Sequence, residues 1–301
     1  MKDKKIIRQG SARLVAVVGP TGSGKTEWTK KLAQKFNAKV ISADSRQIYK
    51  GMDIGTGKDK TFEQEMIDII EPDKSYSIAD YKKQTEDLIN QYLAMNCLPM
   101  ISGGSMLYVD SVLNNYVIPP LQHESHKIRE QLEKLKDSEL LSKLKELDEV
   151  SANKIDLHNR RRIIRAIEVS LLTKIPFSKQ FKKLKPKFKV IIIGIKIDRE
   201  TLYSKIDARV DKMIKDGLVE EVRNLLKKYS RHDLPAFNTI GYKEIIDYLK
   251  GRVTLKEAIA KIKTNTHDYV RRQETWFRRN KDIKWVSKYE QAEKLVEKFL
   301  N

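Results

Sequence analysis

The chain has 301 residues, of which 40% are hydrophobic and 34% are charged, and its formal net charge is +19 at pH 7. The length corresponds to about two domains, and the hydrophobic content excludes a chain that is disordered throughout. A single cysteine, Cys97, excludes an intrachain disulfide and a cysteine-cluster metal site. The longest apolar run, 190–195, is far shorter than the ~20 residues of a membrane span, and the N-terminus lacks the apolar stretch of a secretory signal. We therefore expect a cytoplasmic protein without a membrane partner.

The first third of the chain predicts alternating strands and helices. Apolar runs predict strands at Leu14–Val18 and Lys39–Ser42, with a helix at Glu27–Phe36 between them. Two further short strands are predicted at Ile67–Ile70 and Leu98–Ser102, the second of which is stopped by paired glycines. Because alternating strands and helices form parallel sheets with helices on both faces, this pattern favours an α/β fold.

The remainder of the chain divides into a helical segment and a return to the sheet. Pro119 and Pro120 interrupt the chain, and from about 122 to 172 leucines recur at helical spacing among many charges. The run Val190–Ile197 then predicts a strand that rejoins the sheet. The last part predicts helices at about 200–229, 242–249 and 254–280, and a terminal strand and helix within Lys284–Leu300. The predicted organisation is an α/β core of residues 1–118 and 188–301, interrupted by a helical, basic insertion at 119–187.

The positive charge is concentrated in the second part of the chain. Residues 1–118 hold 17 basic and 14 acidic side chains, whereas residues 119–301 hold 43 and 27. Residues 158–190 alone contain eleven Lys or Arg and a single acid, Glu168. A second cluster, RRQETWFRR at 271–279, mixes arginines with aromatic residues. This distribution favours a nucleic-acid partner, and the alternative is a set of solvated helix faces.

A phosphate-binding loop follows the first predicted strand. The residues GPTGSGKT fit the pattern G-x-x-x-x-G-K-[ST] between a strand and a helix, which is the context that the motif requires. The glycines let backbone N–H groups turn toward an anion, Lys25 neutralises phosphate oxygens, and Thr26 can reach them or a Mg²⁺ ion. The predicted phosphate-binding residues are Gly19, Pro20, Thr21, Gly22, Ser23, Gly24, Lys25 and Thr26. ATP is one possible ligand, and a small-molecule kinase with the insertion as its lid is one possible enzyme.

A second segment carries a resemblance to a known family. The phosphate loop is followed by SADSRQIYKGMDIGTGK at 42–58, and together they resemble the tRNA dimethylallyltransferase family in its bacterial form. The same resemblance continues, in the family's order, over about residues 12–280. Its other motifs are GGSMLY (103–108), HNRRRIIRAIEV (158–169), RVDKMIKDGLVEEV (209–222), IGYKE (240–244) and RRQETWFRR (271–279).

The resemblance implies a reaction and a set of catalytic residues. Enzymes of this family transfer a dimethylallyl group from its diphosphate to the exocyclic amine of the adenosine 3′ of the tRNA anticodon. The amine is a weak nucleophile, so transfer needs a base and an anion receptor for the leaving diphosphate. The resemblance implies that Asp44 is the base, and that Thr26 and Arg209 hold the diphosphate with Mg²⁺. Without the resemblance, Asp44 could equally be an N-cap or turn aspartate. Arg209 would then be interpreted as forming a surface ion pair with Asp207 or Asp211.

The resemblance also implies residues that contact tRNA. The target adenine must be splayed out of the anticodon loop before its amine can react. The residues that match tRNA-contacting positions are Asp44, Ser45, Arg46, Gln47, Ser105, Arg129, Arg161, Arg162, Ile163, Ile164, Arg165, Gly241, Tyr242 and Lys243. Arg161 and Arg165 are one helical turn apart and can follow phosphates together. For Tyr242 the alternative is a packing role at the start of a helix.

Some positions depart from the family pattern, and rival functions stay open. Gly57 stands where alanine is frequent, Leu157 replaces a proline, and Asn238 stands where glutamine is frequent. The rivals are a transferase that prenylates free adenine nucleotides, a P-loop small-molecule kinase, and an ATP-gated RNA-binding protein. We expect a monomer.

Overall fold

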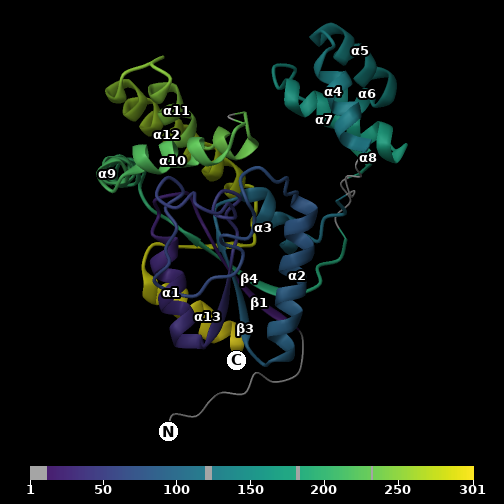
Figure 1. Ribbon diagram of the computed structural model, residues 1–301. Helices are drawn as coiled ribbons and strands as arrows, with labels where there is room; N and C mark the ends of the chain where they lie inside the picture. Colours follow the sequence, from purple (N-terminus) through teal and green to yellow (C-terminus); the bar gives the residue numbers. More distant parts are fainter. Residues whose placement is uncertain (1–11, 119–123, 181–183, 232) are drawn as a thin grey trace. The chain divides into compact units, whose positions relative to one another are not determined.

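A computed structural model of the chain describes residues 12–118, 124–180, 184–231 and 233–301 (Figure 1). The chain divides into two units, Met1–Val109 with Lys187–Asn301, and Asp110–Pro186. The insertion thus begins nine residues before the predicted boundary at 119, which itself lies outside the described residues. The helix α3 (Met106–Leu113) spans this division.

In the described residues the core unit contains one five-stranded sheet, and all its neighbouring strands are parallel. Its order is β2-β3-β1-β4-β5. The strands are β1 (Arg13–Val18), β2 (Ala38–Ser42), β3 (Leu98–Gly103), β4 (Lys189–Ile195) and β5 (Ile283–Val286). The central strand β1 pairs with β3 and β4, and it is buried from Leu14 to Val18, which explains why it reads as a continuous apolar run.

The predicted strand at Ile67–Ile70 is wrong. The segment instead makes two isolated bridges, Ile41 with Glu65 and Tyr49 with Ile70. Met66 and Asp68 adopt positive φ angles of 65° and 55°, and this left-handed backbone interrupts a strand. The Asp68 carboxylate accepts from the buried ammonium of Lys58, which ties this segment to the loop that precedes it.

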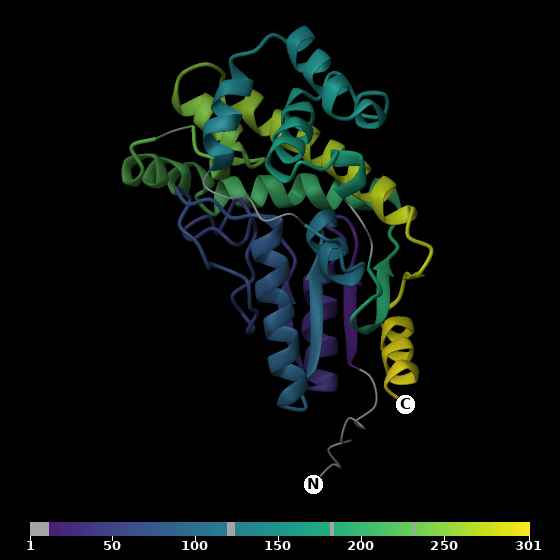
Figure 2. The same ribbon diagram turned by 90° about the vertical axis from the view of Figure 1, so that its right-hand side faces the viewer.

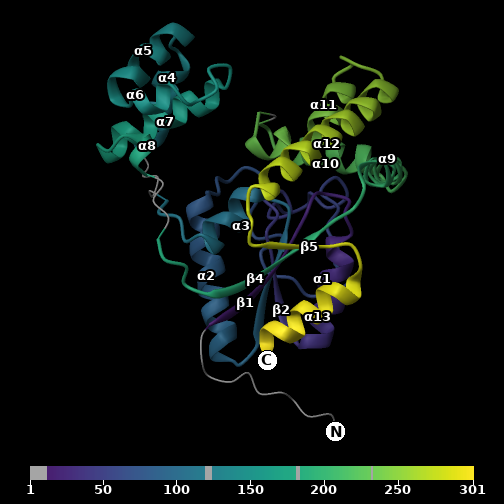
Figure 3. The ribbon, with the colours of Figure 1, turned by 180° about the vertical axis from the view of Figure 1, so that it is seen from behind.

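Helices cover both faces of the sheet. One face is covered by α1 (Lys25–Phe36) and α13 (Tyr289–Leu300), which Figure 3 shows together. Leu32 and Val296 from these helices share one core cluster with Val15 and Val17. The other face carries α2 (Ile78–Ala94), which begins in a capping box formed by its Ser77 N-cap and its third residue. This helix was not predicted from the sequence.

A group of helices lies at the carboxyl end of the strands (Figure 2). They are α9 (Arg199–Lys215), α10 (Leu218–Lys228), the 3-10 turn η1 (Pro235–Asn238), α11 (Tyr242–Leu249) and α12 (Leu255–Arg278). The single helix predicted at about 200–229 is therefore two helices. Gly217 separates them because it has a φ of 104°, a conformation that costs glycine little.

The insertion unit is helical, as its leucine spacing predicts. It contains α4 (Glu124–Glu133), α5 (Asp137–Leu147), α6 (Glu149–Ala152), α7 (Arg160–Thr173) and α8 (Phe177–Gln180). Leu140, Leu144 and Ile167 form its own hydrophobic core. Among the residues that the structure describes, no helix combines the length and apolar character needed to cross a membrane.

Candidate active site

The phosphate loop joins β1 to α1 at the carboxyl edge of the sheet. Gly22 and Gly24 have positive φ angles of 78° and 86°, and Gly24 is the N-cap of α1. The loop thus presents the amino end of a helix, which attracts anions. The Lys25 ammonium donates to the Pro20 carbonyl at 2.7 Å. Burial lowers the pKa of Lys25 to about 8, although the nearby Asp44 carboxylate opposes this shift.

The loops that follow β2 and β3 hold Asp44 beside the phosphate loop. Ser105 N–H donates to the Ala43 carbonyl at 3.1 Å, and Ser105 Oγ accepts from Ser45 N–H at 2.8 Å. A Cβ atom on Gly103 would lie 2.1 Å from the Ala43 oxygen, so only glycine allows this approach. The half-buried Asp44 accepts from Arg46 N–H through Oδ1 at 2.8 Å. Asp44 is therefore fixed by backbone contacts on both sides.

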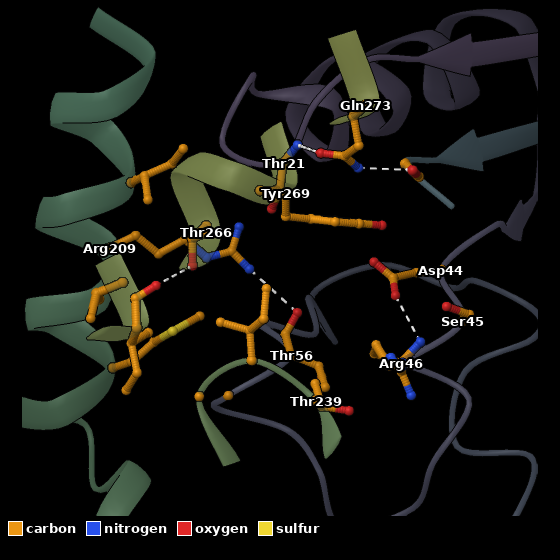
Figure 4. Close-up of a pocket in the computed structure, with 18 of the residues that line it drawn as sticks. Thr21, Asp44, Ser45, Arg46, Thr56, Arg209, Thr239, Thr266, Tyr269 and Gln273 are labelled. Atoms are coloured by element: carbon orange, nitrogen blue, oxygen red, sulfur yellow. Dashed lines mark hydrogen bonds between the residues drawn. The ribbon is translucent and has the colours of Figure 1, made fainter. Parts of the chain in front are cut away.

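Arg209 reaches this edge from α9. Its Nη2 donates to the Thr56 carbonyl at 3.3 Å (Figure 4). Burial lowers the pKa of Arg209, and the Asp44 charge opposes that shift. The neighbouring aspartates lie against other partners, since Asp207 is 2.9 Å from His267 and Asp211 is 2.8 Å from Lys263. The alternative of a surface ion pair therefore does not describe Arg209.

Gly57 explains how Arg209 can lie so close to the loop. A Cβ atom at Gly57 would stand 1.8 Å from Arg209 Nη2. Gly57 also has a φ of 61°, where a side chain is disfavoured. The departure from alanine at this position thus fits the observed placement of the guanidinium.

Two pockets of about 350 and 470 Å³ meet at these groups. Both are lined by Lys25, Asp44 and Arg209. The first has an apolar wall of Ile206, Val210, Met213, Ile240 and Ile262. The second is polar and is lined mainly by the phosphate loop, the 42–64 region and Lys205. A molecule with an anionic part and an apolar part could therefore place its two parts in different pockets around one carboxylate.

The donor set fits a magnesium ion held mainly by substrate. The described residues contain no group of three or more His, Cys, Asp or Glu arranged to hold a metal. Thr26 lines the second pocket and has a side-chain oxygen. Magnesium commonly keeps several waters and binds one or two protein oxygens plus substrate phosphates. Thr21 also lines this pocket with a hydroxyl, and Thr26 is the candidate ligand because it directly follows Lys25 in the loop motif.

The structure brings some of the residues predicted to contact tRNA to the pockets. Asp44, Ser45, Arg46 and Gly241 line the first pocket, and Gln47 lines the second. Ser105 is buried and supports Ser45, and Lys243 is exposed.

The side chain of Tyr242 is not at a surface. It is fully buried, and its hydroxyl donates to Glu221 at 2.6 Å. Glu221 also accepts from the N–H groups of Asp53, Ile54 and Gly55. Of the two interpretations of Tyr242, the structure therefore matches packing at the start of a helix.

In the insertion unit, α7 separates exposed arginines from buried isoleucines. Arg161 and Arg162 are exposed, whereas Ile163 and Ile164 lie in the core of the unit. Helical periodicity turns these two side chains inward, so the predicted contact of Ile163 and Ile164 with tRNA, which stays a prediction, would have to involve their backbone.

A buried acid connects two further predicted residues of the insertion. Glu168 is 1% exposed, and its Oε2 accepts from Arg129 Nη2 and Arg165 Nη1, both at 3.1 Å. Arg129 belongs to α4 and Arg165 to α7. One carboxylate thus fixes two arginines from two helices.

Sequence reasoning missed the contribution of α12. Tyr269, Arg272 and Gln273 all line the first pocket, and Figure 4 shows Tyr269 pointing from α12 toward Asp44. Burial and the Asp44 charge raise the pKa of Tyr269 to about 12. The charge of the motif RRQETWFRR favours a nucleic-acid partner, but its pattern does not indicate which side of the helix faces the phosphate loop, and Tyr269 lies two residues before it.

Comparison with known proteins places the chain in a family. Residues 47–280 match the family described as IPP transferase, and residues 12–70 match the one described as isopentenyl transferase. A tRNA dimethylallyltransferase of Thermoanaerobacter sp. (strain X514) is 42% identical over 308 residues, covering 96% of this chain and 97% of the relative. The chain belongs to the tRNA dimethylallyltransferase family.

Solved structures of the family have the same fold. The tRNA delta(2)-isopentenylpyrophosphate transferase of Staphylococcus epidermidis is 34% identical with a TM-score of 0.69, covering 95% of this chain and 99% of that one. A eukaryotic dimethylallyltransferase acting on tRNA is 25% identical with a TM-score of 0.77, covering 91% and 73%. The predicted family, α/β fold class and prenyltransferase activity are confirmed, and the kinase and free-nucleotide alternatives are not favoured.

Proposed function

We propose that this enzyme transfers the dimethylallyl group of dimethylallyl diphosphate to the exocyclic amine of the adenosine 3′-adjacent to the anticodon of tRNA. The observation that carries the proposal is the meeting of Lys25, Asp44 and Arg209 where the two pockets join. The proposed reaction releases a diphosphate anion and a proton close together. The cations Lys25 and Arg209 can bind the anion, and the Asp44 carboxylate can accept the proton. The enzyme would work as a monomer in the cytoplasm, where its tRNA substrate is found.

In the proposed reaction, each group acts on one part of the substrates. The bond between the allylic carbon and the diphosphate oxygen breaks, and a bond between that carbon and the adenine nitrogen forms. Lys25, Thr26 and Arg209 hold the departing diphosphate, for which a planar guanidinium can supply two hydrogen bonds. Asp44 accepts the proton that the amine loses. Mg²⁺ bound through Thr26 would supply further neutralisation of the diphosphate charge.

The apolar wall of the first pocket suits the prenyl group. Ile206, Val210 and Met213 from α9 line it beside Arg209, so a diphosphate held by Arg209 would have its hydrocarbon end against these side chains. Excluding water from the allylic carbon also protects an electron-poor centre from hydrolysis.

The basic insertion supports an RNA acceptor rather than a free nucleotide. Arg161 and Arg162 are exposed on α7, and Arg129 and Arg165 are fixed by Glu168. Arginines that contact phosphates along a nucleic-acid backbone provide affinity and register. A free adenine nucleotide offers too little backbone to engage four of them.

The proposal is tested by incubating the enzyme with labelled dimethylallyl diphosphate, Mg²⁺, and either unmodified bacterial tRNA or AMP. We expect label in tRNA and none in AMP. Label in AMP alone would assign the chain to the free-nucleotide reaction. ATP hydrolysis without label in either acceptor would overturn prenyl transfer.

The lowered pKa of Lys25 predicts that binding of dimethylallyl diphosphate depends on pH. Since the free-enzyme pKa is about 8, Lys25 is charged below that pH and loses its proton above it. A bound diphosphate favours the charged form, so binding should take up a fraction of a proton near pH 8 and weaken by up to about tenfold per pH unit above it. Calorimetry in two buffers of different ionisation enthalpy measures this uptake. Equal heats in both buffers at pH 8 would contradict the prediction.

Loss of the Glu168 charge is predicted to weaken tRNA binding. Glu168→Gln keeps the shape of the side chain but removes the charge that fixes Arg129 and Arg165. We expect the free energy of unfolding to fall by about 1–2 kcal/mol and tRNA affinity to fall about three- to tenfold, because two arginines must then be ordered on binding. Thermal unfolding and filter binding measure the two effects, with the exposed Glu149→Gln as control. A wild-type tRNA affinity in a folded Glu168→Gln variant would show that Glu168 does not serve RNA binding.

A further inference from the structure

Gln273 joins the two loops that border the site. It lies on α12 and is 1% exposed. Its Oε1 accepts from the Thr21 N–H of the phosphate loop at 2.9 Å, and its Nε2 donates to the Gly104 carbonyl at 2.8 Å (Figure 4). One buried amide thus satisfies a backbone donor of one loop and a backbone acceptor of the other.

The two loops carry different parts of the proposed site. Thr21 lies four residues before Lys25 and belongs to the loop that would bind the diphosphate. Gly104 is followed by Ser105, whose N–H donates to Ala43 and whose hydroxyl accepts from Ser45. Those contacts place the segment that contains Asp44. Gln273 therefore lies between the diphosphate side and the base side of the site.

The Gln273 side chain suits its two hydrogen-bond partners, and Gly104 leaves room for its amide. An amide offers a neutral donor and a neutral acceptor from one planar group. A Cβ atom on Gly104 would lie 2.4 Å from Gln273 Nε2, so the amide can reach the carbonyl only because residue 104 lacks a side chain. Gly104 does not have a positive φ, so alanine there would act mainly by displacing the amide.

We propose that Gln273 is a positioning residue that sets the distance between the diphosphate loop and the Asp44 loop. This inference rests on the proposed function, because it assigns the two loops to the leaving group and the base. Gln273 lines the first pocket but acts through the backbone of the two loops. Reacting groups must be held close to their productive geometry, and a displacement of about 1 Å can cost on the order of a hundredfold in rate.

The first test replaces Gln273 by Met, which has a similar shape and no amide. We expect kcat for transfer to tRNA to fall about tenfold or more, since two buried backbone groups lose their partner and the loops separate. The KM for tRNA should stay within about twofold of wild type. Val270→Ala, a buried change on α12 whose side chain is outside both pockets, controls for loss of stability and should leave kcat unchanged.

A double-mutant cycle with Gly104 makes the test specific. In the wild-type background, Gly104→Ala pushes the Gln273 amide away, and kcat should fall at least about tenfold. In a Gln273→Ala background the amide is gone, and the closest other atom to the added methyl group is the Gly19 carbonyl oxygen at 3.3 Å, which must shift only by a few tenths of an ångström. The same change should therefore cost clearly less there than in the wild-type background. If Gln273→Met does not fold, the Gly104→Ala change with Gln273 present still tests the contact.

The outcomes separate this inference from the proposed function. Absence of transfer to tRNA by the wild-type enzyme would refute the function. Transfer by wild type, with an unchanged kcat in folded Gln273→Met or equal costs of Gly104→Ala in both backgrounds, would refute the role of Gln273 alone. A reduced kcat and a strongly non-additive cycle would establish it.

Discussion

Asp44→Asn is expected to reduce the rate of dimethylallyl transfer about a thousandfold while tRNA binding is retained. A general base contributes about a hundred- to ten-thousandfold to a proton transfer, and an amide cannot take the proton. Asparagine keeps an oxygen that can accept from Arg46 N–H, the contact that Asp44 makes at 2.8 Å, so the loop should hold its conformation. Single-turnover rates at saturating substrates isolate this effect from binding.

The result also bears on Tyr269, which points toward Asp44. With its pKa raised to about 12 by burial and the Asp44 charge, Tyr269 is protonated at neutral pH and cannot replace the carboxylate as base. Tyr269→Phe is the matched comparison, and we expect it to retain far more activity than Asp44→Asn. A rate for Asp44→Asn within about tenfold of wild type would contradict the role of Asp44.

Arg209→Ala is expected to reduce kcat/KM for dimethylallyl diphosphate by about a hundred- to a thousandfold. The guanidinium lies at the junction of the pockets, where charge develops on the leaving diphosphate, and removal of one such donor typically costs this much. Arg209→Lys keeps the charge without the planar fork, so we expect it to recover part of the loss.

The alternative explanation of an Arg209 effect is purely structural, since the side chain also donates to the Thr56 carbonyl. Lys58→Met provides a comparison, because it removes a buried cation that holds Asp53 and Asp68 in the same segment and lines neither pocket. It should lower stability with little change in KM for dimethylallyl diphosphate. Equal KM changes in both variants would contradict a specific role for Arg209.

Sequence patterns predicted those parts of the fold and the site whose residues are contiguous in the chain. The phosphate loop was predictable because its glycines, Lys25 and Thr26 are contiguous between a buried strand and a helix. The sheet was largely predictable because strands buried on both faces, such as β1 and β3, read as apolar runs. Asp44 was located through the resemblance, and the parallel sheet then brings it to the same edge as Lys25.

Other features depend on contacts between distant segments. The isoleucines of α7 adjoin arginines in sequence, but the opposite face of the same helix buries them. The buried hydroxyl of Tyr242 donates to Glu221, which is 21 residues away in the sequence. Gln273 accepts a hydrogen bond from the N–H of Thr21, which is 252 residues away in the sequence. Hydrogen bonds between residues so far apart leave no periodic pattern in the sequence. A glutamine beside arginines therefore cannot be distinguished from an ordinary exposed polar residue.

The central claim is that the exocyclic amine of the adenosine 3′ of the anticodon accepts the dimethylallyl group. Its most direct test uses an anticodon stem-loop that lacks this one functional group. The adenosine 3′ of the anticodon is replaced by purine riboside, which lacks the exocyclic amine, and the stem-loop is incubated with the enzyme, Mg²⁺ and labelled dimethylallyl diphosphate. The account predicts label in the unmodified stem-loop and none in the substituted one, although both bind. Equal labelling of the two would contradict it, because the accepting nitrogen would then lie elsewhere.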